Sequence, residues 1–366
     1  MIAEEISKKI EAVEKEIRDT PYDKSSQFHH GVLKAKLSKL RDMLEVKNSS
    51  GGGGVGYAIK HSGDASVVLV GLPSVGKSTL LNAITNAESK VGNYDFTTLG
   101  VIPGMMEYKG INIQILDLPG IIEGAATGKG FGRKVLSVVR ASDLVILMAD
   151  VDRINWIGKI KNEMEQAGVR PNQEPPKIII NRVTKGGLRI LDPFNVLPMD
   201  QMETIALEMG YESALIQLVE KIETVDRFID GLSKSRTYIP LLEIVTKIDT
   251  VKNLQSSNFK LQKKEDRLYM SVDKGIGVEE FKEAVWRKLG LVRVYLKRER
   301  TGEPDKKEPL IMHRGQNLRD VLNKISTQMS EDVARGFVWG KGARFPGQEV
   351  SFKYEVWDEM EVWFGR

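Results

Sequence analysis

The sequence contains no cysteine and no long apolar run, and both absences restrict what the protein can be. Without cysteine the chain can form neither a disulfide framework nor a metal site with thiolate ligands. This composition fits a reducing compartment, so we expect a cytoplasmic protein. No apolar segment approaches the ~18 residues of a membrane span, and the acidic N-terminus lacks the apolar core of a signal peptide. We therefore expect no membrane partner.

An excess of charge of one sign is also lacking. The 54 basic residues stand against 50 acidic ones, which gives a formal net charge of +4 at pH 7. Such a balance is no general argument for binding nucleic acid, and we expect no DNA partner. Hydrophobic residues make up 41% of the chain and charged residues 28%, as is usual for globular proteins. The length of 366 residues predicts about two to three domains.

One stretch organises the chain. The apolar run Val67–Val70 is followed by the pattern G-x-x-x-x-G-K-S, with Gly71, Gly76, Lys77 and Ser78 at its fixed positions, and then by residues at helical spacing. Strand, glycine loop and helix in this order are the context that a phosphate-binding loop requires. Backbone N–H groups and the positive helix N-terminus hold the charges of a polyphosphate there. We predict that Lys77 reaches the β- and γ-phosphates and that Ser78 ligates Mg²⁺.

The alternative is a chance glycine-rich turn after a strand. The complete set of fixed positions and the correct flanking pattern argue against it. The nucleotide-binding residues predicted for this loop are Gly71, Pro73, Ser74, Val75, Gly76, Lys77, Ser78 and Thr79.

Two segments after the loop carry residues that are expected to respond to a γ-phosphate. Thr98 lies in a polar segment without a helical period, and we expect its hydroxyl to complete the Mg²⁺ shell. An alternating apolar strand then ends in D-x-x-G, where Asp117 is predicted to hold Mg²⁺ through water and the Gly120 N–H to contact the γ-phosphate. The predicted catalytic residues are Lys77, Thr98 and Gly120, and the predicted metal ligands are Ser78, Thr98 and Asp117.

A second motif predicts that the base is guanine. An apolar strand leads into Thr246, Lys247 and Asp249, which have the layout of N-K-x-D with threonine at the asparagine position. A carboxylate at Asp249 accepts hydrogen bonds from guanine N1 and N2, a donor pair that adenine lacks. Charge-assisted hydrogen bonds contribute ~1.5–3 kcal/mol and neutral ones ~0.5–1.5 kcal/mol. The missing asparagine should therefore weaken the site without removing its guanine preference. Ser271 and Val272 complete the predicted nucleotide-binding set, with the Ser271 backbone near the base oxygen.

Residue 121 is isoleucine, directly after Gly120. A GTPase of the Ras type has a glutamine there, which orients the attacking water. An aliphatic side chain cannot do this. Either hydrolysis is slow, or another group, ion or partner positions the water, and the sequence leaves both possibilities open.

Residues 1–48 are predicted to form a helical hairpin, because apolar residues recur at spacings of three and four in two segments separated by Thr20–Asp23. A glycine-rich linker is predicted for residues 49–62. Several basic residues of the hairpin occur with no acidic residue between them. They form either a solvated face or a surface that contacts phosphate. These residues are Lys24, Lys34, Lys36, Lys39 and Arg41.

The segment between Asp117 and Asp249 is longer than a minimal GTPase domain needs. We predict a GTPase domain over residues 63–169 and 237–290, interrupted at 170–236 by an α+β subdomain. The insert shows strand patterns near 177–180 and 188–191 and helical segments from 202 to 232, the last of which fits either the insert or the GTPase domain.

Residues 291–366 are predicted to form a β-grasp domain with a helix over 317–329. Six of its aromatic residues are more typical of a core than of base-stacking groups. They are Phe337, Trp339, Phe345, Phe352, Trp357 and Trp363.

These motifs resemble those of the developmentally regulated GTP-binding proteins, as an archaeal-type member among the Obg-like P-loop GTPases. The residues that carry the resemblance are Gly71–Thr79, Asp95–Leu99 and Asp117–Gly124, together with Thr20–Asp23 and Leu33–Leu37. The resemblance implies an α/β P-loop GTPase with a helical hairpin, an inserted subdomain and a C-terminal TGS domain. It further implies that a hydrophobic residue is normal at position 121, with a bound K⁺ ion as one suggested means of catalysis.

The resemblance also implies a role in translation, with the ribosome or ribosomal RNA as partner. It allows a small regulatory protein as a second partner. We therefore predict a slow, Mg²⁺-dependent hydrolysis of GTP to GDP and phosphate that serves as a regulatory switch. Two alternatives remain. One is an ATP-using relative of similar architecture, suggested by Thr246. The other is an adaptor that binds RNA or protein, is stabilised by nucleotide and has negligible turnover.

Overall fold

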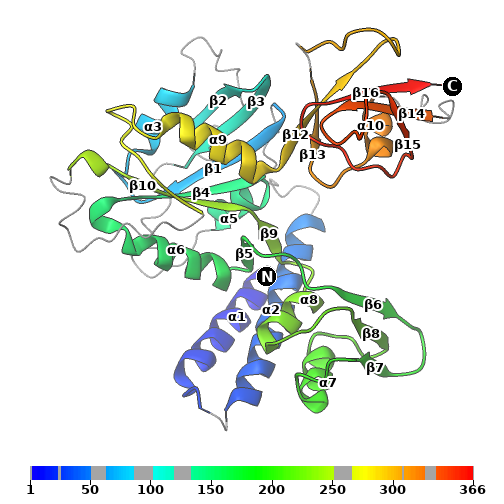
Figure 1. Ribbon diagram of the computed structural model, residues 1–366. Helices are drawn as coiled ribbons and strands as arrows, with labels where there is room; N and C mark the ends of the chain where they lie inside the picture. The colour runs from blue at the N-terminus through cyan, green and yellow to red at the C-terminus, as the bar shows by residue number, and fades with distance from the viewer. Residues whose placement is uncertain are drawn as a thin grey trace. The chain divides into compact units, whose positions relative to one another are not determined.

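The computed structural model describes residues 2–23, 26–50, 63–85, 102–118, 133–250, 266–306, 309–325 and 335–365 (Figure 1). The chain forms two compact units, one from Met1–Ala58 and Met164–Tyr238 and the other from Ile59–Glu163 and Ile239–Arg366. Each unit has its own sheet and its own apolar core. Within the described ranges, no helix combines the length and the apolar character needed to cross a membrane.

A six-stranded sheet forms the centre of the second unit, with the strand order β11-β10-β4-β1-β3-β2. Neighbouring strands are parallel except for β2, which runs antiparallel to β3. Every residue of β1, β4 and β10 is buried, which explains why apolar residues dominate these strands in the sequence. The strands are β1 (Ala65–Gly71), β2 (Ile102–Tyr108), β3 (Ile111–Asp117), β4 (Leu144–Asp150), β10 (Leu241–Thr246) and β11 (Arg267–Tyr269).

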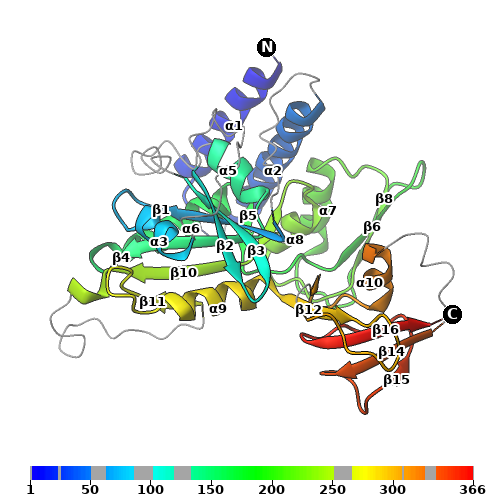
Figure 2. The same ribbon diagram turned by 90° about the horizontal axis from the view of Figure 1, so that it is seen from above.

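Helices cover both faces of this sheet. In both ribbon views α3 and α9 lie on one face, and α5 and α6 lie on the other (Figures 1 and 2). Because β1 lies between β3 and β4, the chain changes direction across the sheet there, and a ligand site is expected at the carboxyl ends of these strands. The helices are α3 (Lys77–Ile84), α5 (Arg133–Arg140), α6 (Asn155–Gln166) and α9 (Val278–Leu289), with short 3₁₀ turns η1 (Val151–Arg153) and η2 (Ile248–Thr250).

A five-stranded sheet follows in the C-terminal part of this unit, with the order β13-β12-β16-β14-β15. Leu318 and Val321 of α10 enter a core with Val294, Val338 and Val362 from the sheet. The strands and the helix confirm the predicted C-terminal sheet domain, and residues 326–329 of the predicted helix lie outside the described residues. The elements are β12 (Leu291–Leu296), β13 (Leu310–His313), α10 (Leu318–Ile325), β14 (Arg335–Gly340), β15 (Gln348–Val350) and β16 (Met360–Gly365).

Two of the six aromatic side chains predicted for this core are exposed instead. Phe345 is 60% exposed and Trp357 is 52% exposed. Phe345 lies in the tight connection between β14 and β15, where Gly342 and Gly347 have positive φ angles. A Cβ atom at Gly342 would lie 2.5 Å from Trp357 Cδ1, so this ring covers the backbone of the connection rather than entering the core. The prediction was wrong at these two positions, because apolar character does not determine which side of a turn a side chain faces.

The first unit combines the N-terminal helices with a three-stranded sheet of order β6-β8-β7. β8 was not predicted, because helical segments were expected throughout residues 202–232. It lies between α7 and α8 in sequence and pairs with both β6 and β7. The elements are α1 (Ile2–Asp19), α2 (Gln27–Ser50), β5 (Val169–Pro171), β6 (Ile178–Arg182), β7 (Leu188–Leu191), α7 (Met199–Glu208), β8 (Ala214–Leu218), α8 (Val225–Leu232) and β9 (Thr237–Ile239).

The helical hairpin and the insert share one core. α2 packs against α1, as the apolar stripes predicted, and also against α7 and α8. Ala35 of α2 is fully buried in a cluster with Ile205 of α7 and Phe228 of α8. The last helix of the insert therefore packs with the hairpin and with the other helix of the insert. α2 extends through Ser50 into the predicted linker, and residues 51–62 of that linker lie outside the described residues.

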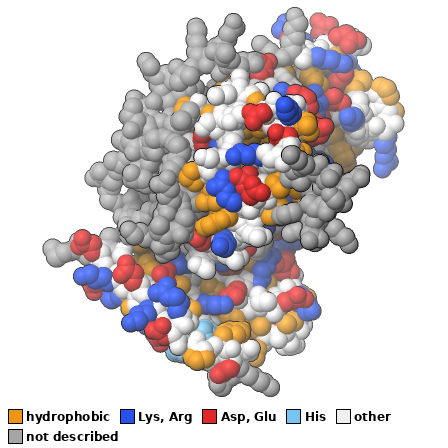
Figure 3. All heavy atoms as spheres, turned by 90° about the vertical axis from the view of Figure 1, so that its left-hand side faces the viewer, with side chains coloured by type: hydrophobic (Ala, Val, Ile, Leu, Met, Phe, Trp, Pro, Cys, Tyr) orange, Lys and Arg blue, Asp and Glu red, His pale blue; other side chains and the backbone are white. Residues whose placement is uncertain are grey.

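Two basic residues of α2 have acidic partners within the same unit. Lys34 Nζ lies 2.8 Å from Asp226 Oδ2, and Arg41 Nη2 donates to Glu14 Oε1 at 2.8 Å. Lys36 is exposed, and Lys24 lies outside the described residues. On the face drawn in Figure 3, the described residues mix basic and acidic side chains without a large patch of one sign. The predicted basic face is therefore partly used to connect helices.

A buried ionic cluster lies where β5 and β9 pair. Arg170 Nη2 and Nε donate to the two oxygens of Asp230 at 2.7 and 2.5 Å, and Arg236 Nε donates to Asp230 Oδ1 at 2.5 Å. The side chain of Asp230 is 5% exposed, and those of Arg170 and Arg236 are 13% and 8% exposed. Removing one member of such a buried pair leaves an uncompensated charge, so this cluster should matter strongly for folding.

Candidate functional site

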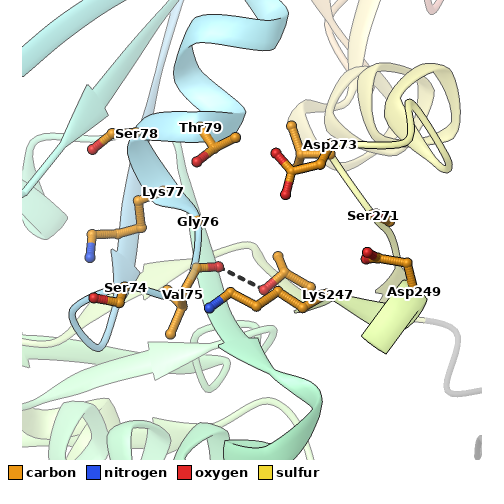
Figure 4. A pocket seen from close by; sticks show the side chains of 12 residues that line it. Ser74, Val75, Gly76, Lys77, Ser78, Thr79, Lys247, Asp249, Ser271 and Asp273 are labelled. Atoms are coloured by element: carbon orange, nitrogen blue, oxygen red, sulfur yellow. Dashed lines mark hydrogen bonds between the residues drawn. The ribbon is translucent and has the colours of Figure 1, made fainter. Parts of the chain in front are cut away.

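A pocket of about 290 Å³ lies next to the carboxyl ends of β1 and β10 (Figure 4). The phosphate-loop segment Ser74–Thr79 forms one side of it. Residues that follow β10 and β11 form the other side, among them Asp249 and Ser271. The pocket is lined by Ser74, Val75, Gly76, Lys77, Ser78, Thr79, Thr246, Lys247, Asp249, Ser271, Val272 and Asp273.

The backbone of the phosphate loop requires glycine at two positions, Gly71 and Gly76. Gly76 has a φ of 93° and directly precedes the first residue of α3. A Cβ atom at Gly71 would lie 2.5 Å from the Met148 carbonyl oxygen, so no larger residue fits at the end of β1. The loop therefore leads straight into the N-terminus of α3, where free N–H groups and the helix dipole favour an anion.

Lys77 is almost fully buried, with 7% of its surface exposed. Its Nζ donates to the Gly71 and Leu72 carbonyl oxygens at 3.0 and 3.1 Å. Burial lowers the pKa of the Lys77 ammonium, and the charge of Asp117 opposes this shift. The ammonium is thus held in the loop with little hydration, where its interaction with a phosphate is strong.

Ser78 and Asp117 form the part of the site that fits a metal ion. Asp117 ends β3 and is fully buried, and its Oδ2 accepts a hydrogen bond from Ser78 Oγ at 2.9 Å. Asp117 Oδ1 is buried without a hydrogen-bond partner among the described atoms. A hydroxyl and a carboxylate with free acceptor capacity are the hard oxygen ligands that Mg²⁺ prefers. No cluster of three or more acidic, histidine or cysteine side chains suited to a metal occurs in the described part of the chain, so phosphate oxygens and water would supply the other ligands.

The opposite side of the pocket carries the residues predicted to bind the base. Asp249 is exposed, and the neighbouring Ser271 hydroxyl lowers the pKa of its carboxyl, which keeps it ionised. Thr246 is 2% exposed and donates from Oγ1 to the Val75 carbonyl at 2.6 Å. Lys247 has a φ of 59°, a left-handed conformation that turns the chain between Thr246 and Asp249. Figure 4 shows the Lys247 side chain running toward the phosphate loop.

Most predicted site residues therefore meet in one place. Gly71 and Pro73 belong to the loop beside the pocket, and Asp117 contacts Ser78 from β3. Thr98, Gly120 and Ile121 lie outside the described residues. The roles of the individual residues stay predictions.

Comparisons with known proteins agree with this geometry. A family model described as 50S ribosome-binding GTPase matches residues 66–182, and a model of the C-terminal region of that domain matches residues 185–291. A GTP-binding protein of Methanocaldococcus jannaschii is 42% identical over 96% of this chain and 91% of that protein. Developmentally-regulated GTP-binding protein 2 of Homo sapiens is 35% identical over 96% of each chain. Ribosome-interacting GTPase 1 of Saccharomyces cerevisiae is 36% identical over 97% of each chain.

The chain belongs to the developmentally regulated GTP-binding proteins. This confirms the predicted family and the predicted α/β P-loop GTPase fold. For this member of the family, a bound guanine nucleotide and Mg²⁺ agree with the oxygen ligands and the exposed carboxylate described above.

The sequence analysis missed three charged residues of this site. Arg153 Nε donates to both oxygens of Asp150 at 3.0 and 3.1 Å, its Nη2 also donates to Asp150, and Nη2 donates to the Pro73 carbonyl at 3.3 Å. The Arg153 hydrogen bonds lower the pKa of the Asp150 carboxyl. Asp273 lines the pocket directly after Val272. The spacing of Asp150 and Arg153 at the end of a buried strand could have indicated this pairing. An aspartate caps a short helical turn by accepting from the backbone N–H three residues later, as Asp150 does at the start of η1.

Proposed function

We propose that this protein binds GTP in this pocket, hydrolyses it slowly to GDP and phosphate, and acts as a switch on the ribosome in the cytoplasm. The observation that carries the proposal is the convergence of Lys77, the Ser78–Asp117 pair and Asp249 on one pocket. Each would recognise a different part of one ligand, namely the phosphates, the metal ion and the base.

Positioning and neutralisation of charge would carry most of the chemistry. Lys77 and the loop N–H groups would hold the β- and γ-phosphates in line for attack by water. Ser78 and Asp117, together with Thr98, would hold Mg²⁺, which supplies neutralisation of the developing phosphate charge. The Gly120 N–H would contact the γ-phosphate.

The attacking water would need a group other than residue 121, because an isoleucine cannot orient it. A K⁺ ion or a small regulatory partner protein would serve. A partner that supplies a positive charge could raise the rate by ~10³–10⁵. A slow intrinsic rate that rises with K⁺ or with a partner would support this part of the proposal. No turnover with ribosomes, K⁺ and partner proteins present would favour the adaptor alternative.

The guanine assignment is tested by Asp249→Asn. The amide presents an N–H to the base edge, so preference should move from GDP to xanthosine diphosphate. Asp273→Asn is the matched control, since Asp273 lines the same pocket but has no assigned contact with the base. Competition of ADP and xanthosine diphosphate against labelled GDP measures the preference. Unchanged selectivity in Asp249→Asn, or effective displacement by ADP in the unaltered protein, contradicts a guanine site.

The ribosome assignment is supported by two similarities, one to the ribosome-interacting GTPase of yeast and one to the family described as 50S ribosome-binding GTPases. Co-sedimentation with ribosomes should be measured with GDP and with a non-hydrolysable GTP analogue across a salt series. We expect binding with the GTP analogue that weakens with salt, because phosphate contacts release counterions. Absence of binding in both nucleotide states would redirect the search to a protein partner.

A further inference from the structure

The three-stranded sheet of the insert has one covered face and one open face. Along β6, β7 and β8 the side chains alternate between the two faces. Ile190, Ile216 and Leu218 lie in the core that α2, α7 and α8 complete. A Cβ atom at Gly231 of α8 would lie 2.4 Å from Ile178 Cδ1, so this helix lies directly against β6. In both ribbon views α7 and α8 lie on the same side of the sheet (Figures 1 and 2).

The open face of this sheet carries aliphatic side chains. The strand register aligns two rows of residues across the open face. The first row is Ile179, Gln217 and Leu191, and the second row is Asn181, Leu215 and Arg189. Ile179 is 47% exposed and Leu191 is 50% exposed. More than half of the exposed large apolar side chains of the described chain lie between residues 179 and 219, and such a concentration marks an interaction surface.

Basic side chains accompany these aliphatic ones. Residues 177–191 contain Lys177, Arg182, Lys185 and Arg189 but no acidic residue. Arg182 stacks on the Tyr211 ring, with 4.7 Å between the guanidinium carbon and the ring centroid. Within the described residues, neither Lys185 nor Arg189 has an acidic partner within 4 Å, although other basic residues of this unit form such pairs. The charge that complements the open face is therefore negative.

The dimensions of the open face match a single α-helix. β6 and β7 are two strand spacings apart, roughly 10 Å, which is also the diameter of a helix with its side chains. β6 has five residues and thus a length of ~17 Å, which about three helical turns cover. Helices already cover the other face of the same sheet, and a second layer of helix is a common way to cover a sheet face.

Two other occupants fit these observations less well. Neither row contains an aromatic side chain on which an RNA base would stack. Phosphate groups over Ile179, Leu215 and Leu191 would lose hydration without gaining a partner. A second copy of this chain in a two-fold contact would bring the same basic side chains against each other, which is repulsive.

We propose that the open face of the insert sheet binds an acidic amphipathic helix of a partner protein. The apolar stripe of that helix covers Ile179, Leu215 and Leu191, and its carboxylates pair with Arg189 and Lys185. The surface belongs to the unit that contains the helical hairpin, and none of its residues lines the nucleotide pocket. The inference is therefore independent of the proposed GTPase activity.

The first test uses a designed peptide as the probe. The peptide has about five helical turns, with leucine along one stripe, glutamate on both sides of it and alanine elsewhere. We expect saturable binding in fluorescence anisotropy, weakened by salt. A peptide of the same composition with its leucines distributed around the helix, and one with lysine in place of glutamate, should each bind at least tenfold more weakly. No saturable binding of the acidic amphipathic peptide, or equal binding of the lysine peptide, overturns the inference.

The second test locates the peptide on the protein. Ile179→Asp and Leu191→Asp should each lower peptide affinity at least tenfold, because an apolar contact is replaced by a charge that repels the peptide. Leu207→Asp is the matched control, since Leu207 is 48% exposed on α7 and outside both rows. Equal losses in all three variants contradict this site. Thermal unfolding of each variant separates a loss of fold from a loss of binding.

Arg189→Gln tests the contribution of charge on the same face. Peptide affinity should fall about threefold, the size of one exposed ion pair, and less at high salt. Lys36→Gln is the matched control, because Lys36 is exposed on α2, whose core contacts lie on the covered side of the sheet. An unchanged affinity in Arg189→Gln contradicts the role of charge in this surface.

The other occupants give different results with the same variants. Duplex and single-stranded RNA should bind equally well to the unaltered protein and to Ile179→Asp. An RNA affinity that Ile179→Asp abolishes would assign the face to RNA and overturn the inference. Self-association in sedimentation that Ile179→Asp abolishes would overturn it in favour of a second copy. GDP affinity of Ile179→Asp should stay unchanged, so a failure of this inference and a failure of the proposed GTPase function are distinguishable.

Discussion

The nucleotide pocket and the ionic cluster of the insert use the same kinds of side chain for different purposes. In the cluster, the two oxygens of Asp230 accept three hydrogen bonds from Arg170 and Arg236, and the carboxylate is 5% exposed. In the pocket, Asp117 Oδ1 has no partner among the described atoms, and Asp249 is exposed. Folding uses both oxygens of the first carboxylate, whereas it leaves Asp117 Oδ1 without a partner among the described atoms and leaves Asp249 exposed, where a ligand can reach it. Changes in the cluster should therefore affect stability, and changes in the pocket should affect binding.

The largest effect is expected for Asp230→Asn. It removes the charge that compensates two buried guanidinium groups, and we expect the free energy of unfolding to fall by ~3–5 kcal/mol. Denaturant unfolding followed by circular dichroism measures this. Asp226→Asn on the same helix is the matched control, because its carboxylate is 58% exposed and should contribute little. GDP affinity below the unfolding transition should stay unchanged, because no residue of the cluster lines the pocket.

Lys77→Met should give the opposite pattern. The loss of the ammonium removes charge-assisted contacts of ~1.5–3 kcal/mol with phosphate, and the dissociation constant for GDP should rise roughly 100-fold. The nucleotide-free protein should be as stable as the unaltered one or more stable, because burial lowers the pKa of Lys77 and the charged form is disfavoured there. Isothermal titration and thermal unfolding of the nucleotide-free protein measure the two effects. A loss of stability like that of Asp230→Asn would remove the distinction between pocket and cluster.

Removal of Mg²⁺ should lower GDP affinity by a smaller factor, and this experiment tests whether Asp117 holds the ion. Chelation with EDTA should weaken GDP binding by the unaltered protein about tenfold, the size of one charge-assisted contact. Asp117→Asn should bind GDP at this weaker level and should no longer respond to EDTA, because the free carboxylate oxygen is gone. Full Mg²⁺ dependence in the variant would mean that the ion is held without Asp117.

The motifs of the pocket could be predicted from the sequence because they serve a ligand. Gly71 and Asp117 end the adjacent parallel strands β1 and β3, and fixed spacing from Gly71 places Lys77 at the start of α3. The hydrogen bond of Thr246 to Val75 could not be predicted, because its acceptor is set by the distance between β10 and the phosphate loop in three dimensions.

The ionic cluster and the shared core had no such pattern in the sequence. Arg170 and Asp230 are 60 residues apart and pair only after β5 and α8 have docked. β8 was missed because a strand of five residues between two helices is too short to show a two-residue period that would distinguish it from a continuing helix. The helical hairpin was predicted from its apolar stripes. Its packing on α7 involves Ala35, and an alanine in a sequence does not indicate which neighbouring helix it will contact.

The smallest effect is expected for Lys34→Ala, which tests whether exposed ion pairs contribute to the contact between α2 and α8. Lys34 and Asp226 are 2.8 Å apart but 38% and 58% exposed, so solvent screens their attraction and side-chain entropy opposes it. We expect the free energy of unfolding to fall by about 0.5 kcal/mol or less, and the matched control Lys36→Ala to change it by no more than that. A double-mutant cycle with Asp226→Ala isolates the pair energy. A coupling near that of the buried cluster would mean that pairing alone, and not burial, determines what a charge contributes in this protein.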